Sequence, residues 1–140
     1  MNSKIEKRLR GYIFSRPFME ERVPQHVQNI VIRDYCSQKD IQYLLSATEY
    51  AMENSSLMLR QLIKDLPFID GIVAYSIFQM PEGDDERQSI FNSVLSYNKE
   101  IHFALEDLSL IDRGSYDNIE SIWQVKKTLP NCNFLEILQN

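Results

Sequence analysis

The sequence RGYIFSRPF, residues 10–18, decides how the rest of the chain is interpreted. Its apolar run YIF predicts a short strand over residues 11–15, which Pro17 ends because proline cannot donate a hydrogen bond to a sheet. Ser15 and Arg16 follow the apolar run directly, and a helical pattern begins a few residues later. In α/β proteins, functional side chains gather where a strand ends and the backbone turns toward a helix. We therefore expect Ser15 and Arg16 to lie at a ligand site.

The length and composition of the chain predict one soluble domain. Its 140 residues are 44% hydrophobic and 25% charged, which is enough to bury a core without disulfides or metals. The N-terminal sequence MNSKIEKRLR lacks the apolar centre of a signal peptide, and no apolar run approaches the ~18 residues of a membrane span. Cys36 and Cys132 do not have the spacing of metal ligands, so we expect reduced thiols in a cytoplasmic protein.

Positive charge gathers in the first half of the chain. The net charge is −5, but residues 1–69 carry ten Lys or Arg against eight Asp or Glu, whereas residues 70–140 carry five against twelve. An acidic chain is a poor general binder of nucleic acid, because neutralising phosphates supplies most of the non-specific affinity. We expect no nucleic-acid partner, although the positive charge near the first strand suits a small anion.

Helical and strand patterns alternate along the first half. Apolar spacing predicts a helix over about residues 23–38, and a short apolar run predicts a strand over residues 41–47. A second helix is capped within residues 54–56 and ended by Pro67. Residues 72–77 form the most apolar run, as expected of a central parallel strand.

The same alternation continues in the second half. Asp84 or Asp85 caps a third helix, and residues 101–105 predict a fourth strand. The motif Asp117-x-x-Glu resembles a capping box that opens a last helix, which runs to about Thr128. Beyond the stop at Pro130, the apolar tail NFLEIL should dock on the domain, and residues 1–9 should form a flexible lead-in. 

The elements therefore alternate as β-α-β-α-β-α-β-α within one domain over residues 1–140, whose C-terminal helix and tail occupy residues 108–140. Short connections and right-handed crossovers favour an open α/β fold with a parallel four-stranded sheet and helices on both faces.

This succession of elements resembles the catalytic domain of serine recombinases of the resolvase and invertase type, over residues 11–107. The resemblance implies a flavodoxin-like sheet with strand order 2-1-3-4. The family's Tyr-x-Arg-x-Ser motif is matched from Tyr12, so that Phe14 stands at the arginine position and Arg16 at the position of the nucleophilic serine. Ser15 comes one residue early and points to the opposite face of the strand. We therefore expect no DNA strand exchange.

Four longer phrases resemble a bacterial family of "sporadic carbohydrate cluster" proteins. They are RGYIFSRPF, ERVPQHVQNIVIRDYC, LLSATEYAMEN and HFALE, within residues 10–106. Members of that family occur among genes for surface-polysaccharide and lipopolysaccharide biosynthesis. The resemblance implies a biological setting, but it implies no reaction.

The expected strand order places a crevice at the carboxyl ends of the first and third strands, where the connections leave in opposite directions. The side chains expected there are Ser15, Arg16, Thr48, Glu49, Tyr50, Ser76, Phe78, Gln79 and Glu106.

A positively charged helix start lies beside this crevice. Arg16 and Arg22 flank the predicted start at Val23, where free backbone N–H groups favour an anion. A sugar phosphate or a nucleotide sugar fits this chemistry, with Gln25 and Asn29 as candidates for binding hydroxyls. Alternatively, both arginines pair with surface carboxylates, namely Glu20, Glu21 or Glu49.

Three residues are candidates for catalysis. Glu49 is the preferred general base, His26 at the helix start is a candidate neutral base, and Ser15 is a candidate nucleophile that lacks a Gly-x-Ser-x-Gly elbow. Glu106 is a second carboxylate, and His102 is expected to pack against a sheet face. The sequence contains neither a dinucleotide-binding fingerprint nor a metal-ligand cluster, so we expect no cofactor and no metal.

Two hypotheses for function follow. The first is a protein of bacterial surface-carbohydrate biosynthesis that binds a phosphorylated or nucleotide-linked sugar and that modifies it or only binds it. The alternative is a non-catalytic module on a degenerate recombinase-like scaffold, which self-associates into a homo-oligomer or binds a partner. Residues 123–138 would then form an exchanged or docked arm, although packing against their own domain is the simpler arrangement.

Overall fold

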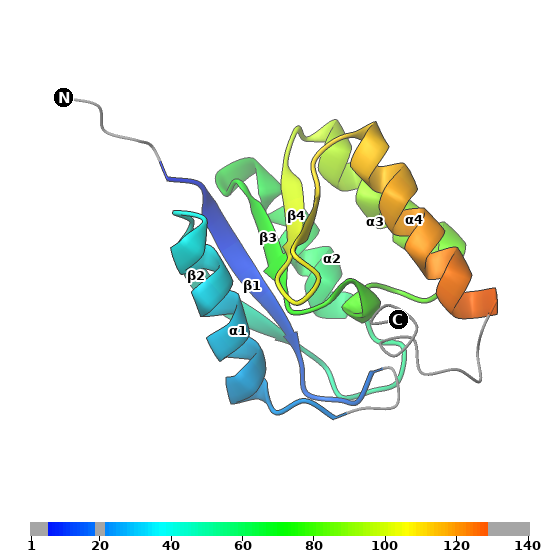
Figure 1. Cartoon of the computed structure of the whole chain (residues 1–140), viewed down its shortest axis with the longest axis horizontal. Coiled ribbons are helices and arrows are strands. Elements are labelled where there is room, and N and C mark those ends of the chain that lie inside the picture. The colour runs from blue at the N-terminus through cyan, green and yellow to red at the C-terminus, as the bar shows by residue number, and fades with distance from the viewer. Residues whose placement is uncertain (1–5, 19–21, 129–140) are drawn as a thin grey trace.

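The apolar run after Gly11 forms a strand in the middle of a larger sheet. The computed structural model describes residues 6–18 and 22–128, and Figure 1 shows their arrangement. In chain order the elements are β1 (Arg8–Phe14), α1 (Gln25–Gln38), β2 (Gln42–Glu49), α2 (Leu57–Lys64), the 3-10 helix η1 (Leu66–Phe68), β3 (Gly71–Ala74), the 3-10 helix η2 (Ile77–Gln79), α3 (Asp84–Ser96), β4 (Glu100–Phe103), β5 (Leu108–Leu110) and α4 (Arg113–Thr128).

The sheet has the strand order β2-β1-β3-β4-β5. The first four strands are parallel, which confirms the predicted α/β fold and the order 2-1-3-4. β5 pairs antiparallel with β4 and was not predicted. The turn between them places Asp107 in the left-handed region at φ 53°, which lets the chain reverse within a few residues.

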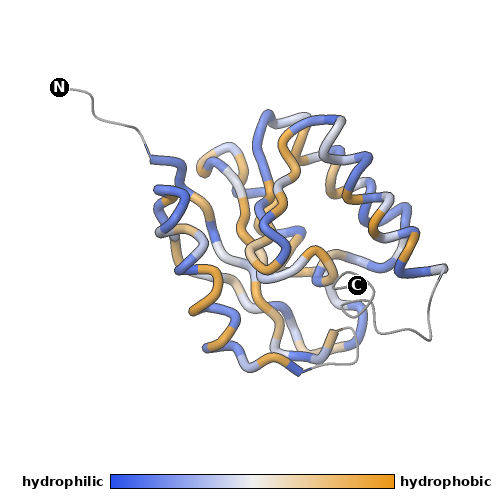
Figure 2. Tube along the Cα trace, viewed as in Figure 1, coloured by the Kyte–Doolittle hydropathy of each residue, from blue (hydrophilic) through white to orange (hydrophobic). Residues whose placement is uncertain are grey.

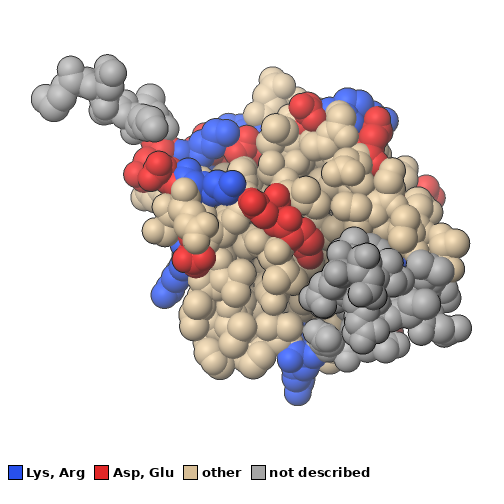
Figure 3. Space-filling view, viewed as in Figure 1, with Lys and Arg blue, Asp and Glu red and all other residues tan. Residues whose placement is uncertain are grey.

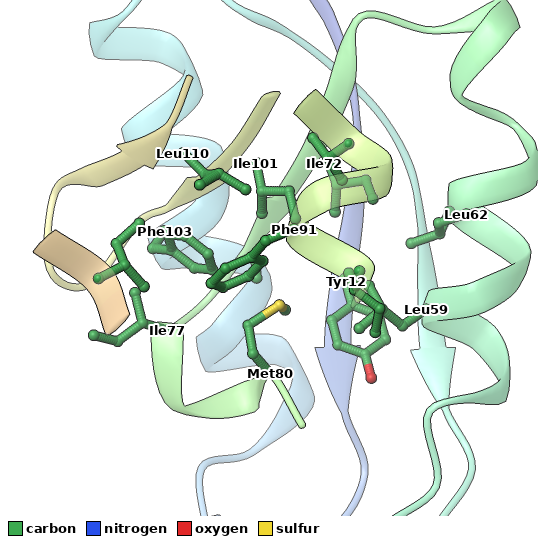
Figure 4. Packing of buried hydrophobic residues seen from close by; sticks show 14 of the residues in the cluster. Tyr12, Leu59, Leu62, Ile72, Ile77, Met80, Phe91, Ile101, Phe103 and Leu110 are labelled. Atoms are coloured by element: carbon green, nitrogen blue, oxygen red, sulfur yellow. The ribbon is translucent and has the colours of Figure 1, made fainter. Parts of the chain in front are cut away.

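The two faces of the sheet carry separate apolar clusters, because side chains alternate along each strand. Leu9 and Ile13 of β1 pack beneath α1, which covers one face (Figure 1). Tyr12 and Phe14 belong to the cluster formed with α2, α3 and α4 on the other face. Figure 4 shows this second cluster, with Tyr12 beside Leu59 of α2. Along α3 and α4 the chain alternates between polar and apolar stretches, as expected of helices with one buried side (Figure 2).

Two strand boundaries differ from the prediction in ways that affect the site. β2 continues through Glu49 instead of stopping at Ala47. β3 ends at Ala74 instead of Ile77, because the chain turns into η2 within the predicted strand. Thr48 and Glu49 therefore lie inside β2 instead of after it. Residues 75–77 lie in the turn into η2 instead of inside β3.

Two helix starts also differ. α4 begins at Arg113, so the prediction of a capping box at Asp117 was wrong. The reciprocal bonds lie earlier: Asp112 Oδ1 accepts from the Ser115 N–H at 2.8 Å, and Ser115 Oγ accepts from the Asp112 N–H at 3.0 Å. α3 begins after Gly83, so that Asp84 lies in its first turn instead of capping it.

A buried ion pair joins α4 to α3. The Arg87 side chain is 0% exposed and donates to both oxygens of Glu120, at 2.6 and 2.8 Å. Its guanidinium carbon lies 4.6 Å from the centroid of the Trp123 ring. Further along, Lys127 reaches Asp84 at 2.7 Å. α4 therefore runs antiparallel to α3, and its last turn lies beside the start of α3.

An irregularity marks the outer strand β2. The register with β1 shifts between the pairs Arg10↔Leu44 and Tyr12↔Ala47, so β2 contains one extra residue at a bulge. The Arg10 Nε–H donates to the carbonyl oxygen of Leu45 within that bulge, at 3.1 Å. The absent side chain of Gly11 leaves room for the bulged segment.

Several predicted features lie outside the described residues. These are the first five residues of the lead-in predicted at residues 1–9, the carboxylates Glu20 and Glu21, the stop at Pro130, Cys132 and the apolar tail at residues 133–138. The end of the predicted lead-in is instead part of the sheet, because β1 begins at Arg8 and Leu9 is fully buried. Cys36 is a buried free thiol, and burial raises its pKa to about 11. Within the described residues, no helix combines the length and apolar character needed to cross a membrane.

Replacing Gly71 with Ala tests the close packing of β3. A Cβ at this position would overlap the backbone carbonyl oxygen of Glu100 on the paired strand. We expect the free energy of unfolding, measured by urea denaturation, to fall by about 1–3 kcal/mol. Gly114→Ala is the matched control, because its nearest contact is an ordinary 3.6 Å. Equal stabilities of the two variants would contradict the packing seen here.

Candidate functional site

An open pocket of about 820 Å³ lies at the carboxyl ends of β1 and β3. Its lining comes from three segments, within residues 12–18, 51–56 and 78–86. The connections from β1 and β3 lead to helices on opposite faces of the sheet, which makes this the switch point of the fold. The sequence placed a crevice at these strand ends. That a ligand binds there stays a prediction.

Glu49 lies beneath the pocket wall, with its carboxylate turned into the protein. The residue is only 1% exposed. Donors approach both of its oxygens; they are the Tyr12 hydroxyl at 2.9 Å, the Tyr50 N–H at 3.0 Å, the Ser55 hydroxyl at 2.9 Å, the Met58 N–H at 3.1 and 3.2 Å, and the Leu59 N–H at 3.2 Å. Ser56, at the N-cap of α2, makes no capping bond with its side chain. Glu49 therefore caps α2 from the end of β2.

The hydrogen bonds also set the charge of Glu49. Burial opposes ionisation, but the donors from Met58, Ser55, Tyr50 and Tyr12 outweigh it and hold the pKa of Glu49 below its usual value. Burial and the neighbouring Glu49 charge raise the pKa of Tyr12. A carboxylate that is ionised at neutral pH and has donors on both oxygens is poorly suited to accept a proton there.

Ser15 and Arg16 hold the loop that follows β2. Ser15 Oγ donates to the carbonyl oxygen of Glu49 at 3.2 Å. Arg16 donates to the carbonyl oxygens of Tyr50 and Ser55, both at 2.9 Å, while its guanidinium carbon lies 4.0 Å from the centroid of the Phe14 ring. No carboxylate of the described residues lies within ion-pair distance of Arg16. Arg16 lines the pocket, but these bonds already orient it toward the protein.

A pair of buried glutamines joins the ends of β1 and β3. Gln28 Oε1 accepts from the Phe14 N–H at 3.0 Å, and its Nε2 donates to the carbonyl oxygens of Phe14 and Val23. Gln79 Nε2 donates to Gln28 Oε1 at 2.8 Å, and Gln79 Oε1 accepts from the Tyr75 N–H at 3.1 Å. Gln79 was a predicted ligand-binding residue, and it does line the pocket. Both ends of its amide are engaged within the protein.

Ser76 and Glu106 form a second carboxylate cap. Ser76 Oγ donates to Glu106 at 2.7 Å, and the other oxygen of Glu106 accepts from the Ile77 N–H at 2.9 Å. Burial raises the pKa of Glu106, and the hydrogen bonds from Ser76 and Ile77 offset only part of that effect. Neither Ser76 nor Glu106 lines the pocket. They instead fix the turn at η2.

The structure separates the remaining predicted residues from the pocket. Arg22, Gln25 and His26 are exposed around the start of α1, and Tyr50 lines a different groove, between α2 and α3. Asn29 accepts a hydrogen bond from Tyr43 at 2.7 Å. His102 lies between the Tyr35 hydroxyl and Glu100, at 2.7 Å from each, where β4 packs toward α1.

Sequence reasoning missed most of the acidic lining of the pocket. The charged lining residues are Arg16, Glu53, Glu82 and Glu86. The Ser56 hydroxyl donates to Glu86, and Arg60 also donates to that carboxylate at 2.8 Å. Hydrogen bonds from Ser56 and Arg60 lower the pKa of Glu86, and burial offsets part of this effect. No group of side chains able to hold a metal ion occurs among residues 6–18 and 22–128.

The charges on the molecular surface are mixed. On the face shown in Figure 3, Lys and Arg side chains alternate with Asp and Glu and form no continuous basic stripe. The absence of a nucleic-acid partner stays a prediction.

The fold is similar to those of two serine recombinase domains. A resolvase family site-specific recombinase from Streptococcus pneumoniae aligns with a TM-score of 0.62 at 7% sequence identity, over 86% of this chain and 89% of that chain. The N-terminal catalytic domain of TP901-1 integrase aligns with a TM-score of 0.55 at 12% identity, over 86% of this chain and 95% of that chain. At these identities the likeness shows the fold alone.

The sequence itself has no such match. No protein-family model matches the chain, and no curated protein matches it. The resemblance to the recombinase scaffold is therefore confirmed at the level of the fold. The resemblance to the sporadic carbohydrate cluster family receives no support and stays a prediction.

Replacing Glu49 with Gln tests the cap on α2. We expect the free energy of unfolding near pH 7 to fall by about 1–3 kcal/mol, because backbone donors lose a charged acceptor. The folded-state pKa of Glu49 lies below its ordinary 4.5. The contribution of the Glu49 carboxylate to the free energy of unfolding is therefore fully present above pH 4.5, and it is lost as the pH falls toward the folded-state pKa.

Guanidinium denaturation of both proteins at about pH 7 and about pH 3.5 measures this dependence. The difference between wild type and Glu49→Gln should shrink in acid. Glu53→Gln is the control, since Glu53 is exposed on the same loop, and it should change stability by less than about 0.5 kcal/mol. A Glu49→Gln deficit that grew in acid would show that the carboxylate does not act as a charged cap.

Proposed function

We propose that the chain is a non-catalytic binding module that holds a sugar in the pocket at the ends of β1 and β3. The pocket volume of about 820 Å³ falls in the range of small-molecule sites. Pro17, Phe18 and Pro81 supply accessible apolar surface, and Glu53 and Asn54 supply hydrogen-bonding groups. Apolar surface beside a few acceptors suits a sugar, whose C–H faces pack on the first and whose hydroxyls donate to the second. This combination is the observation that carries the proposal.

The state of the acidic residues supports binding without chemistry. Glu49 is occupied by the start of α2, Glu106 by η2, and Glu86 by Ser56 and Arg60. Ser15 donates to a backbone carbonyl and has no neighbouring base among its described partners. Arg16 stands at the position of the recombinase nucleophile. A fold supports a reaction only through the residues of its site, so the similar fold does not imply the recombinase reaction.

The charge of the lining favours the neutral part of a ligand. Glu53, Glu82 and Glu86 outnumber Arg16, and like charges would repel a phosphate. A sugar phosphate or nucleotide sugar would have to place its phosphates outside this lining, toward Arg22 and the exposed start of α1. A role in bacterial surface-carbohydrate biosynthesis and a cytoplasmic location rest on the sequence resemblance and on composition.

A second candidate is a module that binds itself or a partner protein without a small ligand. Exposed apolar side chains near the outer strand β2 favour it: Leu45 is 83% exposed and Met52 is 63% exposed. On this alternative, sugars would not stabilise the protein, and its mass in solution would rise with concentration.

A thermal-shift panel of neutral sugars and nucleotide sugars separates these functions. A bound sugar at a hundredfold excess over its Kd should raise Tm by about 5–10 °C. Glu53→Ala and Glu82→Ala should each weaken the binding of a neutral sugar by about tenfold, because each removes a charged acceptor. The same variants should strengthen the binding of an anionic ligand.

Asp117→Ala is the matched control, since it removes one exposed carboxylate from α4, away from the pocket lining. It should leave every Kd unchanged. Light scattering of the same samples reports self-association. An absence of any shift across the panel, together with a concentration-dependent mass, would favour the second candidate and reject the sugar site.

A further inference from the structure

A groove of about 640 Å³ runs between α2 and α3, and it is separate from the sugar pocket. Leu57, Met58, Ile63 and Ile90 give it an apolar lining, and Leu57 is 56% exposed. Its charged lining residues are Arg60 and Lys64, with no carboxylate among the described residues that line it. An apolar groove with a basic rim suits an apolar segment that carries negative charge.

Such a segment follows α4 in the same chain. Residues 133–138 read NFLEIL and place Glu136 among four large apolar residues. The twelve residues from 129 to 140 contain no Lys or Arg. Both the apolar content and the charge of this segment therefore complement the groove.

The position of α4 brings the segment within reach. Lys127 contacts Asp84 at 2.7 Å, so the end of α4 lies beside the start of α3. The groove residues Ser89 and Ser93 lie five to nine positions further along α3, or roughly 8–14 Å at the helical rise. Residues 129–133 span up to about 17 Å when extended. The connection therefore suffices within one chain.

We propose that residues 133–138 bind the α2–α3 groove of their own chain, with the apolar side chains on its lining and Glu136 facing Lys64 and Arg60. Arg60 already donates to Glu86 at 2.8 Å, whereas Lys64 has no partner among the described residues. Lys64 is therefore the charge that Glu136 neutralises. This assignment is independent of any sugar in the pocket.

A photo-crosslinker tests the assignment in the full chain. p-Benzoylphenylalanine in place of the exposed Leu57, irradiated at low protein concentration, should crosslink to residues 133–138 within a monomer. The control carries the same group in place of Ile30, which is 60% exposed on α1 across the sheet, and should give no such product. Peptide mapping by mass spectrometry identifies the linked residues.

Charge reversal then tests the pairing. Lys64→Glu and Glu136→Lys should each lower the crosslink yield by about two- to fivefold, the factor expected of an exposed ion pair, and their combination should restore it. Arg33→Glu, at an exposed position of α1, should have no effect. Crosslinks between two chains would overturn the proposal and assign the groove to a second copy. Crosslinks elsewhere, or yields unchanged by Lys64→Glu, would also overturn it.

Discussion

The carboxylate of Glu49 is the interaction on which the functional end of the molecule depends. It accepts from the Tyr12 hydroxyl on β1, from the Ser55 hydroxyl in the following loop and from the N–H groups that begin α2. An uncapped helix start leaves several donors unsatisfied, and Ser56 does not supply a side-chain bond. A single ionised group therefore fixes the distance between the sheet and α2, and with it one wall of the pocket. Glu106, which follows β4, likewise accepts a hydrogen bond from a backbone N–H at the start of η2.

The fold could be predicted because its signals are local and mutually consistent. Apolar runs of strand length alternate with helical spacing, and the resulting order leaves few possible windings. β5 escaped prediction because its pairing comes from the tight turn at Asp107 and not from a pattern within its three residues. The start of α4 was misplaced because two acids separated by helical spacing also occur inside helices. Glu120 serves there as the buried partner of Arg87.

The orientation of the site residues was harder to predict than their location. Glu49 lies two residues after the buried Ala47, so it shares that face once β2 is known to continue. The predicted strand stopped at Ala47, and the acid was therefore assigned to the crevice. Gln28 gave a usable signal, since it precedes Ile32 and Tyr35 at helical spacing on the buried side of α1. The role of Arg16 could not be predicted from the sequence, because its partners are backbone carbonyl oxygens, which no sequence pattern reveals.

The bulge in β2 has a consequence for how the protein behaves among its copies. β2 is an outer strand of eight residues, long enough to template further strands from neighbouring molecules. The bulge twists the strand at Leu45, and Arg10 holds that residue's carbonyl oxygen, which spoils the regular row of donors and acceptors that fibril growth requires. The opposite edge, β5, is only three residues long. Both edges of the sheet are therefore poor templates for the addition of a further regular strand.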